Sequence, residues 1–172
     1  MFELFILSKL LHRPMHGYLI QTILNSALGP ARRVSWGTLY PLIRRLEKNG
    51  FIVATDADAT DPRGKRQYRA TEAGRARFIE LMNNRGDLGN NSPDSFRIKL
   101  GCFGHLDDEA RIQIITDYRR YLLSVQSHIE SMPERIFNEG DPFADEKRFA
   151  LLALEHRRIV TQSEIDWTDS VF

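Results

Sequence analysis

Apolar residues recur at helical spacing in three stretches near the start of the chain. They cover about residues 2–11 and 18–27, and a segment that opens at Ser35 and closes before Gly50. Apolar positions three or four apart form one face of an α-helix, so each stretch predicts an amphipathic helix. Ser35 suits a helix N-cap, while Gly29 and Gly50 suit the positions just beyond helix ends.

After Gly50 the pattern changes from helical to strand-like. Residues 51–55 and 66–71 are short and contain β-forming side chains, and a polar loop with Pro62 and Gly64 separates them. This arrangement predicts a β-hairpin with a long loop, after which Thr71 caps a further helix. Three helices, a hairpin and another helix predict a winged helix-turn-helix domain over residues 1–84, although such a fold alone does not establish a function.

Glycine, asparagine and proline concentrate in residues 83–93, which therefore predict a linker. Residues 94–172 show no strand pattern and predict a second, helical domain. Apolar stripes over residues 114–129 and 149–167 fall on two long helices. Because so few helices enclose little core, we expect a second copy of the chain to cover them. The predicted fold class is mainly α with a small β-hairpin wing.

The formal charge of +1 conceals an uneven distribution along the chain. Residues 1–86 carry 14 Lys and Arg against 7 Asp and Glu, whereas the remaining residues carry 10 against 16. A basic half beside an acidic half indicates that the first half faces a polyanion, and nucleic acid is the natural candidate.

The third predicted helix has the sharpest pattern. Its aliphatic residues gather on one side, and its basic residues lie on the other. Gly37 leaves room for a DNA backbone to approach, and Arg44 has the forked geometry that pairs with a guanine edge or a phosphate. Pro41 costs about 3 kcal/mol inside a helix. It therefore indicates a kink or a requirement of contact geometry.

Basic clusters flank this helix on both sides, before it and in the predicted hairpin. A helix in the major groove with a wing on the neighbouring backbone or minor groove would use all three groups. The predicted DNA-binding residues are Arg32, Arg33, Ser35, Trp36, Gly37, Thr38, Tyr40, Pro41, Arg44, Arg45, Lys48, Arg63, Lys65 and Arg66.

The run Ser35–Ile52, which reads SWGTLYPLIRRLEKNGFI, resembles the recognition-helix signature of PadR-like transcriptional regulators, including its proline. Residues 16–20 resemble the start of that family's second helix, and residues 68–74 resemble the exit of its wing. The resemblance covers about residues 1–83. It implies a DNA-facing motif at Ser35, Gly37, Thr38, Tyr40 and Pro41, with wing positions at Lys65 and Arg66.

The resemblance also implies a homodimer that acts as a repressor, in which the C-terminal helices pair and the first helix takes part. An inverted-repeat operator would match the twofold symmetry of such a dimer. The residues predicted to hold the two subunits together are Phe2, Phe5, Tyr118, Leu122, Val125, Leu152, Ile159 and Trp167.

The alternatives to a constitutive regulator are an effector-controlled regulator, an adaptor and an enzyme. Some relatives sense small aromatic molecules, so a small aromatic effector is one possibility, and a dimeric adaptor that no longer binds DNA is another. An enzyme is disfavoured, because the five histidines lack metal-ligand spacing and no glycine-rich phosphate loop is present. We therefore expect no metal and no cofactor.

Cysteine content and hydropathy bear on the compartment. Cys102 is the single cysteine and is expected to be a buried apolar residue without a disulfide. No apolar segment approaches the roughly 20 residues needed to span a bilayer. We therefore expect a cytoplasmic protein that has double-stranded DNA and a second copy of itself as partners.

Overall fold

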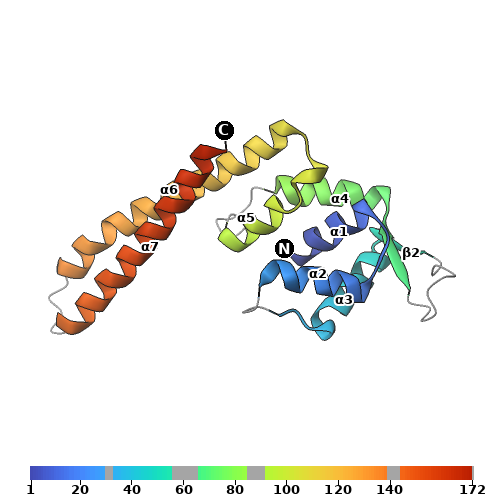
Figure 1. Ribbon diagram of the computed structural model, residues 1–172, viewed down its shortest axis with the longest axis horizontal. Helices are drawn as coiled ribbons and strands as arrows, with labels where there is room; N and C mark the ends of the chain where they lie inside the picture. Colours follow the sequence, from blue (N-terminus) through green and yellow to red (C-terminus); the bar gives the residue numbers. More distant parts are fainter. Residues whose placement is uncertain (30–32, 56–65, 85–91, 139–143, 172) are drawn as a thin grey trace. The chain divides into compact units, whose positions relative to one another are not determined.

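A computed structural model describes residues 1–29, 33–55, 66–84, 92–138 and 144–171, with only the helical backbone described for 133–138 and 144–147. The chain divides into two compact units (Figure 1). The first combines Met1–Asn84 with Pro93–Leu106, and the second consists chiefly of the chain from Asp107 onward.

The first unit contains the elements predicted for a winged helix-turn-helix, with one short strand and two short helical elements in addition. Its elements in chain order are α1 (Phe2–His12), β1 (Met15–His16), α2 (Gly17–Leu28), α3 (Trp36–Lys48), β2 (Ile52–Thr55), β3 (Gln67–Ala70), α4 (Glu72–Asn83), α5 (Pro93–Leu100) and the 3-10 turn η2 (Phe103–His105).

The sheet is antiparallel and has the strand order β1-β3-β2. Ile52 lies opposite Ala70 in the predicted hairpin, and Met15 lies opposite Tyr68 on the other side of β3. The helices, the hairpin and the mainly α fold class are thus confirmed. The third strand was not predicted, because two residues are too few to show the alternation that marks a strand.

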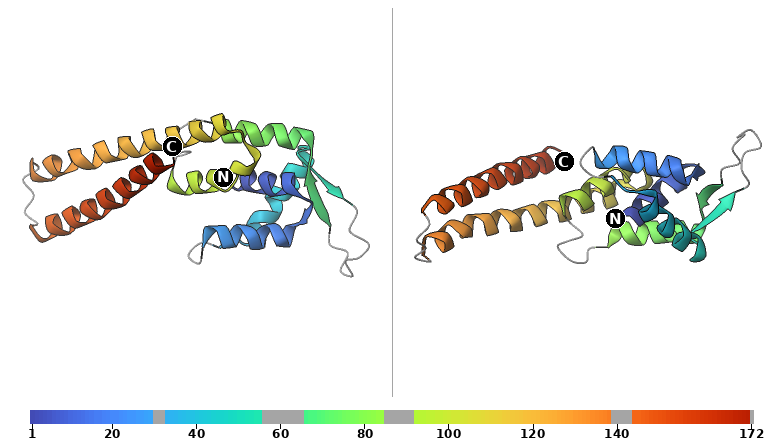
Figure 2. Two further views of the ribbon diagram at one scale, coloured as in Figure 1. Left: turned by 45° about the horizontal axis from the view of Figure 1, so that its top comes forward. Right: turned by 90° about the horizontal axis from the view of Figure 1, so that it is seen from below.

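The core of the first unit lies among α1, α2, α3 and α4, with β2 at its edge (Figure 2). Removal of this apolar surface from water is the main force that holds the helices together. The most deeply buried side chains are Ile6, Leu7, Ile20, Leu24, Leu39, Ile43, Leu46, Ile52, Phe78 and Met82.

The segment Pro93–Leu106 belongs to the first unit, although the sequence analysis expected residues 94–172 to form one helical domain. A ring nitrogen of His105 lies 2.9 Å from the carbonyl oxygen of Ser8, and its ring packs edge-on against Phe78 at 5.5 Å. Phe96 and Cys102 are buried there as well, which confirms the expected burial of the cysteine. These contacts with α1 and α4 place the segment in the first unit.

The second unit is an antiparallel pair of long helices, α6 (Asp108–Asn138) and α7 (Ala144–Ser170), which lie side by side in both figures. The Tyr118 hydroxyl donates a hydrogen bond to Glu164. Arg119 Nε lies 2.6 Å from Asp169 Oδ1, and Gln126 donates to Gln162 at 3.0 Å. The side chains buried in the described part of these two helices are mostly apolar, with two threonines among them: Ile114, Ile115, Tyr118, Leu122, Ile129, Thr161, Ile165 and Thr168.

Within the described residues, no group of three or more His, Cys, Asp or Glu side chains is placed to hold a metal ion. No helix in the described part of the chain is both long and apolar enough to cross a membrane.

Candidate nucleic-acid interface

Helix α3 begins at a capped N-terminus that the sequence analysis predicted. The Thr38 amide donates to Ser35 Oγ at 3.2 Å, which satisfies one backbone donor of the first turn. The residue before the cap is also held: the Val34 amide donates to Asn25 Oδ1 at 2.7 Å, and Gln21 donates to the Val34 carbonyl at 2.9 Å. Side chains of α2 therefore set where α3 starts.

The two faces of α3 differ sharply in exposure. Leu39 and Ile43 are fully buried, Leu46 is 1% exposed, and Leu42 is half-buried. This confirms the predicted amphipathic character of the helix. The exposed side consists of Trp36, Gly37, Thr38, Tyr40, Pro41, Arg44, Arg45 and Lys48.

Pro41 lies on this exposed side, and α3 continues through it to Lys48. Proline has no amide hydrogen, so it cannot donate the helical hydrogen bond to the carbonyl of Gly37 one turn earlier. The missing bond therefore falls on the exposed side, where solvent or a ligand can reach that carbonyl oxygen.

Aromatic side chains continue the exposed face toward α2. The rings of Trp36 and Tyr40 lie 5.5 Å apart, and a Cβ atom on Gly17 would come within 2.4 Å of the Trp36 ring. The missing side chain at Gly17 thus makes room for the indole. A hollow of about 350 Å³ opens here and is lined by His16, Gly17, Tyr18, Trp36, Tyr40, Arg66 and Tyr68.

His16 at the edge of this hollow serves the fold. Its Nδ1 accepts a hydrogen bond from the Leu19 amide at 3.0 Å and so caps α2. The predicted place of His16 at the start of the second helix is thus confirmed.

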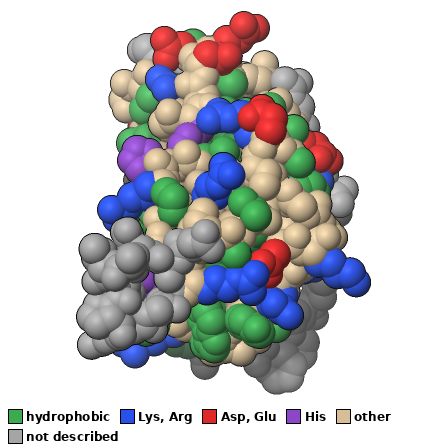
Figure 3. Space-filling model, turned by 90° about the vertical axis from the view of Figure 1, so that its right-hand side faces the viewer, with side chains coloured by type: hydrophobic (Ala, Val, Ile, Leu, Met, Phe, Trp, Pro, Cys, Tyr) green, Lys and Arg blue, Asp and Glu red, His purple; other side chains and the backbone are tan. Residues whose placement is uncertain are grey.

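The wing meets α3 through one carboxylate. Glu47 lies 2.7 Å from Arg66, which precedes β3, and 3.6 Å from Arg44, one turn earlier in α3. Burial raises the pKa of the neighbouring Tyr68 hydroxyl, and the charge of Glu47 raises it further. Figure 3 views the strand-bearing side of the molecule and shows basic side chains beside hydrophobic ones there.

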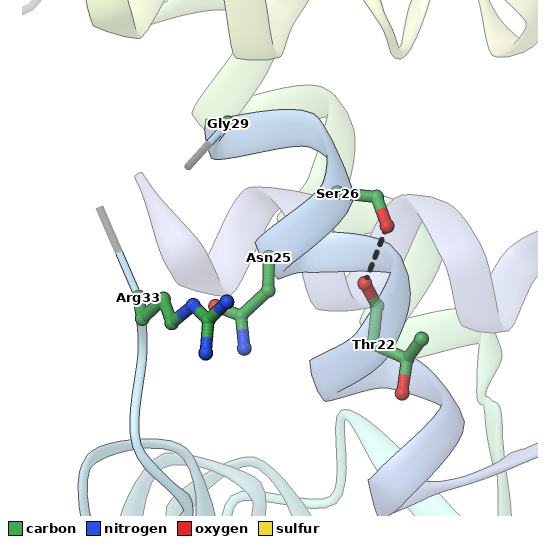
Figure 4. A pocket seen from close by; sticks show the side chains of 5 residues that line it. All are labelled: Thr22, Asn25, Ser26, Gly29 and Arg33. Carbon is green, nitrogen blue, oxygen red and sulfur yellow. Dashed lines mark hydrogen bonds between the residues drawn. The ribbon is translucent and has the colours of Figure 1, made fainter. Parts of the chain in front are cut away.

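Arg33 lies at a second, more polar hollow of about 570 Å³, at the end of α2. Figure 4 shows its guanidinium reaching toward Asn25, while Ser26 donates a hydrogen bond to the Thr22 carbonyl at 3.0 Å. Gly29, with φ of 79°, ends the helix beside this hollow. Arg33 is exposed, as a phosphate contact would require.

The structure brings most of the predicted DNA-binding residues onto one unit and leaves them exposed. Arg32, Arg63 and Lys65 lie outside the described residues. The exposed Tyr18, the half-buried Glu47 and the buried Tyr68 lie among these residues and are absent from the prediction. The position of Glu47, three residues after Arg44 on the same helix, was the one local signal available for it.

The predicted subunit contacts divide into buried, exposed and half-buried residues. Phe5, Tyr118 and Leu122 are buried within the single chain, so a second subunit cannot cover them without rearrangement. Leu152 and Ile159 on α7 are 64% and 53% exposed. Phe2 and Val125 are half-buried, and Trp167 is exposed.

The fold of the first unit and its exposed basic helix define a winged helix-turn-helix protein. The sequence profile of the "Transcriptional regulator PadR-like family" matches residues 6–80. The chain belongs to this family of transcriptional regulators.

Two curated relatives match parts of the chain. Transcriptional regulator Rv3488 of Mycobacterium tuberculosis is 52% identical over 48 residues, which are 28% of this chain and 44% of that protein. The Lysinibacillus sphaericus protein called "Uncharacterized protein X" is 31% identical over 77 residues, which are 45% of this chain and 71% of that protein. The chain thus spans less than half the length of the mycobacterial relative.

Among solved structures, the chain is similar to Bacillus subtilis PadR in complex with operator DNA. The identity is 18% and the TM-score is 0.46, and the match covers 98% of this chain and 94% of that one.

Proposed function

We propose that this protein is a sequence-specific DNA-binding repressor that acts as a homodimer on an inverted-repeat operator. The observation that carries the proposal is the exposure of the basic and hydroxyl-bearing side of α3, while its aliphatic side is buried. A helix anchored in this way can enter the major groove, where Arg44 pairs with a base edge or a phosphate.

The groups around α3 support the same assignment. Thr38 and Tyr40 offer hydroxyls to phosphate oxygens, and Arg33 and Arg66 are exposed on either side of the helix. Phosphate contacts of this kind position a protein on the duplex, whereas contacts with base edges specify the sequence.

The exposed face of α7 supports the dimer. Phe149 and Leu152 are each 64% exposed, and Ile159 follows two turns later on the same side of the helix. Exposed apolar side chains in a row mark an interaction surface. A second copy of α7 is the occupant we propose, because it would bring the same apolar row to the contact.

The hollow beside Trp36 supports a regulatory refinement of the proposal. Its lining is rich in aromatic rings and includes one arginine, so a small planar aromatic molecule fits its chemistry. Because Trp36 and Tyr40 belong to the proposed DNA-facing surface, such an effector would compete with the operator and release it. A thermal-shift panel of small aromatic molecules, followed by DNA release, tests this refinement.

An adaptor that has lost DNA binding is the competing assignment, and the exposed basic face of α3 argues against it. Selection of bound sequences from random duplex DNA tests the proposal. We expect an inverted repeat among the selected sequences, with affinity that falls steeply as salt is added. Recovery of no preferred sequence, together with salt-insensitive behaviour, would favour the adaptor.

A further inference from the structure

The recognition helix and the wing are joined at Glu47, an acidic residue on a surface that the proposed function directs at DNA. Phosphates repel a carboxylate, so the presence of Glu47 on a surface assigned to DNA needs a physical explanation. Glu47 is the shared partner of Arg44 at 3.6 Å and of Arg66 at 2.7 Å. We call these three residues the Glu47 bridge.

The exposures within the Glu47 bridge are unequal. The side chains of Arg44 and Arg66 are 55% and 54% exposed, whereas that of Glu47 is 21% exposed. The carboxylate is therefore largely covered, and both guanidinium groups stay accessible from outside. Arginine presents five N–H donors, so one ion pair leaves donors on each group for a phosphate or a base edge.

Each of the two arginines of the Glu47 bridge also lies close to an aromatic ring. The guanidinium of Arg44 lies 5.9 Å from the centre of the Tyr40 ring, and that of Arg66 lies 5.7 Å from the centre of the Tyr68 ring. Cation–π contact and ion pairing together restrict where a long, flexible side chain can point. Both arginines are thus ordered before DNA arrives, and less conformational entropy is lost on binding.

We infer that Glu47 is a positioning residue for sequence discrimination: it holds an arginine of α3 and an arginine of the wing in one fixed arrangement. This inference rests on the proposed function. Random DNA needs only positive charge, which Glu47 opposes, whereas a specific operator needs arginines at defined positions. Glu47 therefore lowers non-specific affinity and raises operator affinity.

The test compares dissociation constants for an operator obtained by selection and for a scrambled duplex of equal length, at one salt concentration. Glu47→Gln removes the charge and keeps the shape. We expect the ratio of operator affinity to scrambled-duplex affinity to fall about tenfold, within the range of measured pairwise couplings. Affinity for the scrambled duplex should rise, because a negative charge is removed from the surface. Glu80→Gln is the matched control, because Glu80 also pairs with an arginine three residues away on a helix of this unit.

A second variant changes the other partner of the Glu47–Arg66 ion pair, which lies in the wing. Arg66→Gln should also lower the ratio of operator affinity to scrambled-duplex affinity. Because Glu47 acts through Arg66, adding Glu47→Gln to Arg66→Gln should lower this ratio by less than Glu47→Gln does in the wild type. A general loss of protein structure would instead weaken binding to both duplexes by the same factor. An unchanged ratio in Glu47→Gln, with wild-type discrimination intact, would overturn this inference alone. Failure of the wild type to prefer any sequence would overturn the proposed function, and the inference with it.

Discussion

Gly74 approaches the backbone of Phe51 so closely that no side chain fits between them: a Cβ atom at Gly74 would lie 2.0 Å from the Phe51 carbonyl oxygen. The same carbonyl accepts a hydrogen bond from the Thr71 amide at 3.0 Å. Helix α4 is therefore packed directly onto the start of the wing, through backbone rather than side-chain contact.

Gly74→Ala should consequently destabilise the protein. The clash is with backbone, which cannot move aside as a side-chain tip can, so we expect the free energy of unfolding to fall by about 2 kcal/mol or more. Urea unfolding measures it. Gly104→Ala, where an added Cβ meets no atom within 4 Å, is the control and should change little. Equal stability of the two variants would show that α4 does not depend on this approach.

Gly37→Ala should stabilise the protein but weaken its binding to the operator. An added Cβ would have Ser35 Oγ as its nearest neighbour, at 3.7 Å, so alanine fits without strain. Alanine is the better helix former, and we expect the free energy of unfolding to rise by about 0.5–1 kcal/mol. Operator affinity should nevertheless fall about tenfold, because the methyl group would stand on the side of α3 that we assign to DNA. If Gly37→Ala bound the operator as tightly as the wild type does, Gly37 would not belong to the proposed contact surface.

These two glycines illustrate how much of the molecule the sequence predicts. The pattern around Gly37, with its cap at Ser35 and its amphipathic helix, is local, and periodicity with capping rules was enough to predict it. The contact of Gly74 with Phe51 joins residues 23 positions apart. Pattern rules place Gly74 at a helix start but do not show what lies against it.

The same distinction explains the other differences. Strand β1 exists because β3 offers it backbone partners, and its two residues have no pattern of their own. Segment Pro93–Leu106 follows a Gly- and Asn-rich stretch, which favoured its assignment to the second domain. Its membership of the first unit depends on contacts such as that of His105 with Ser8, about 97 positions apart.

His105 should make stability depend on pH. Burial lowers its pKa from the ordinary value of 6.5, although the hydrogen bond to the Ser8 carbonyl opposes this shift. The unfolded chain then binds a proton near pH 6.5 that the folded chain takes up only at lower pH. The contribution of His105 to stability is complete above the unfolded-state pKa of 6.5, and it is lost as the pH falls toward the lowered pKa of the folded state.

Unfolding in urea at about pH 7.5 and about pH 5.5 measures this effect. The wild type should lose more stability between the two conditions than His105→Asn does. His128→Asn, which alters an exposed histidine on α6, should resemble the wild type. If His105→Asn showed the full wild-type pH dependence, the half-buried imidazole would not be its source.

The exposed row on α7 should control assembly. Leu152→Glu places a charge on the face that we assign to the second subunit, where burial without a partner is costly. In sedimentation velocity at one protein concentration, we expect the wild type to sediment as the proposed dimer and Leu152→Glu to sediment as a monomer. Ile112→Glu is the control, since Ile112 is 50% exposed on α6 and lies outside the row. A dimer that survives Leu152→Glu and not Ile112→Glu would place the interface on the other helix.

Operator affinity of Arg44→Ala at fixed salt tests the central claim most directly. Arg120→Ala is the matched control, because Arg120 is also an exposed helical arginine that pairs with an acidic residue three positions away. We predict that Arg44→Ala weakens operator binding by about 1–3 kcal/mol while Arg120→Ala binds as the wild type does. Equal operator affinity of Arg44→Ala and the wild type would contradict the assignment of the exposed side of α3 to DNA.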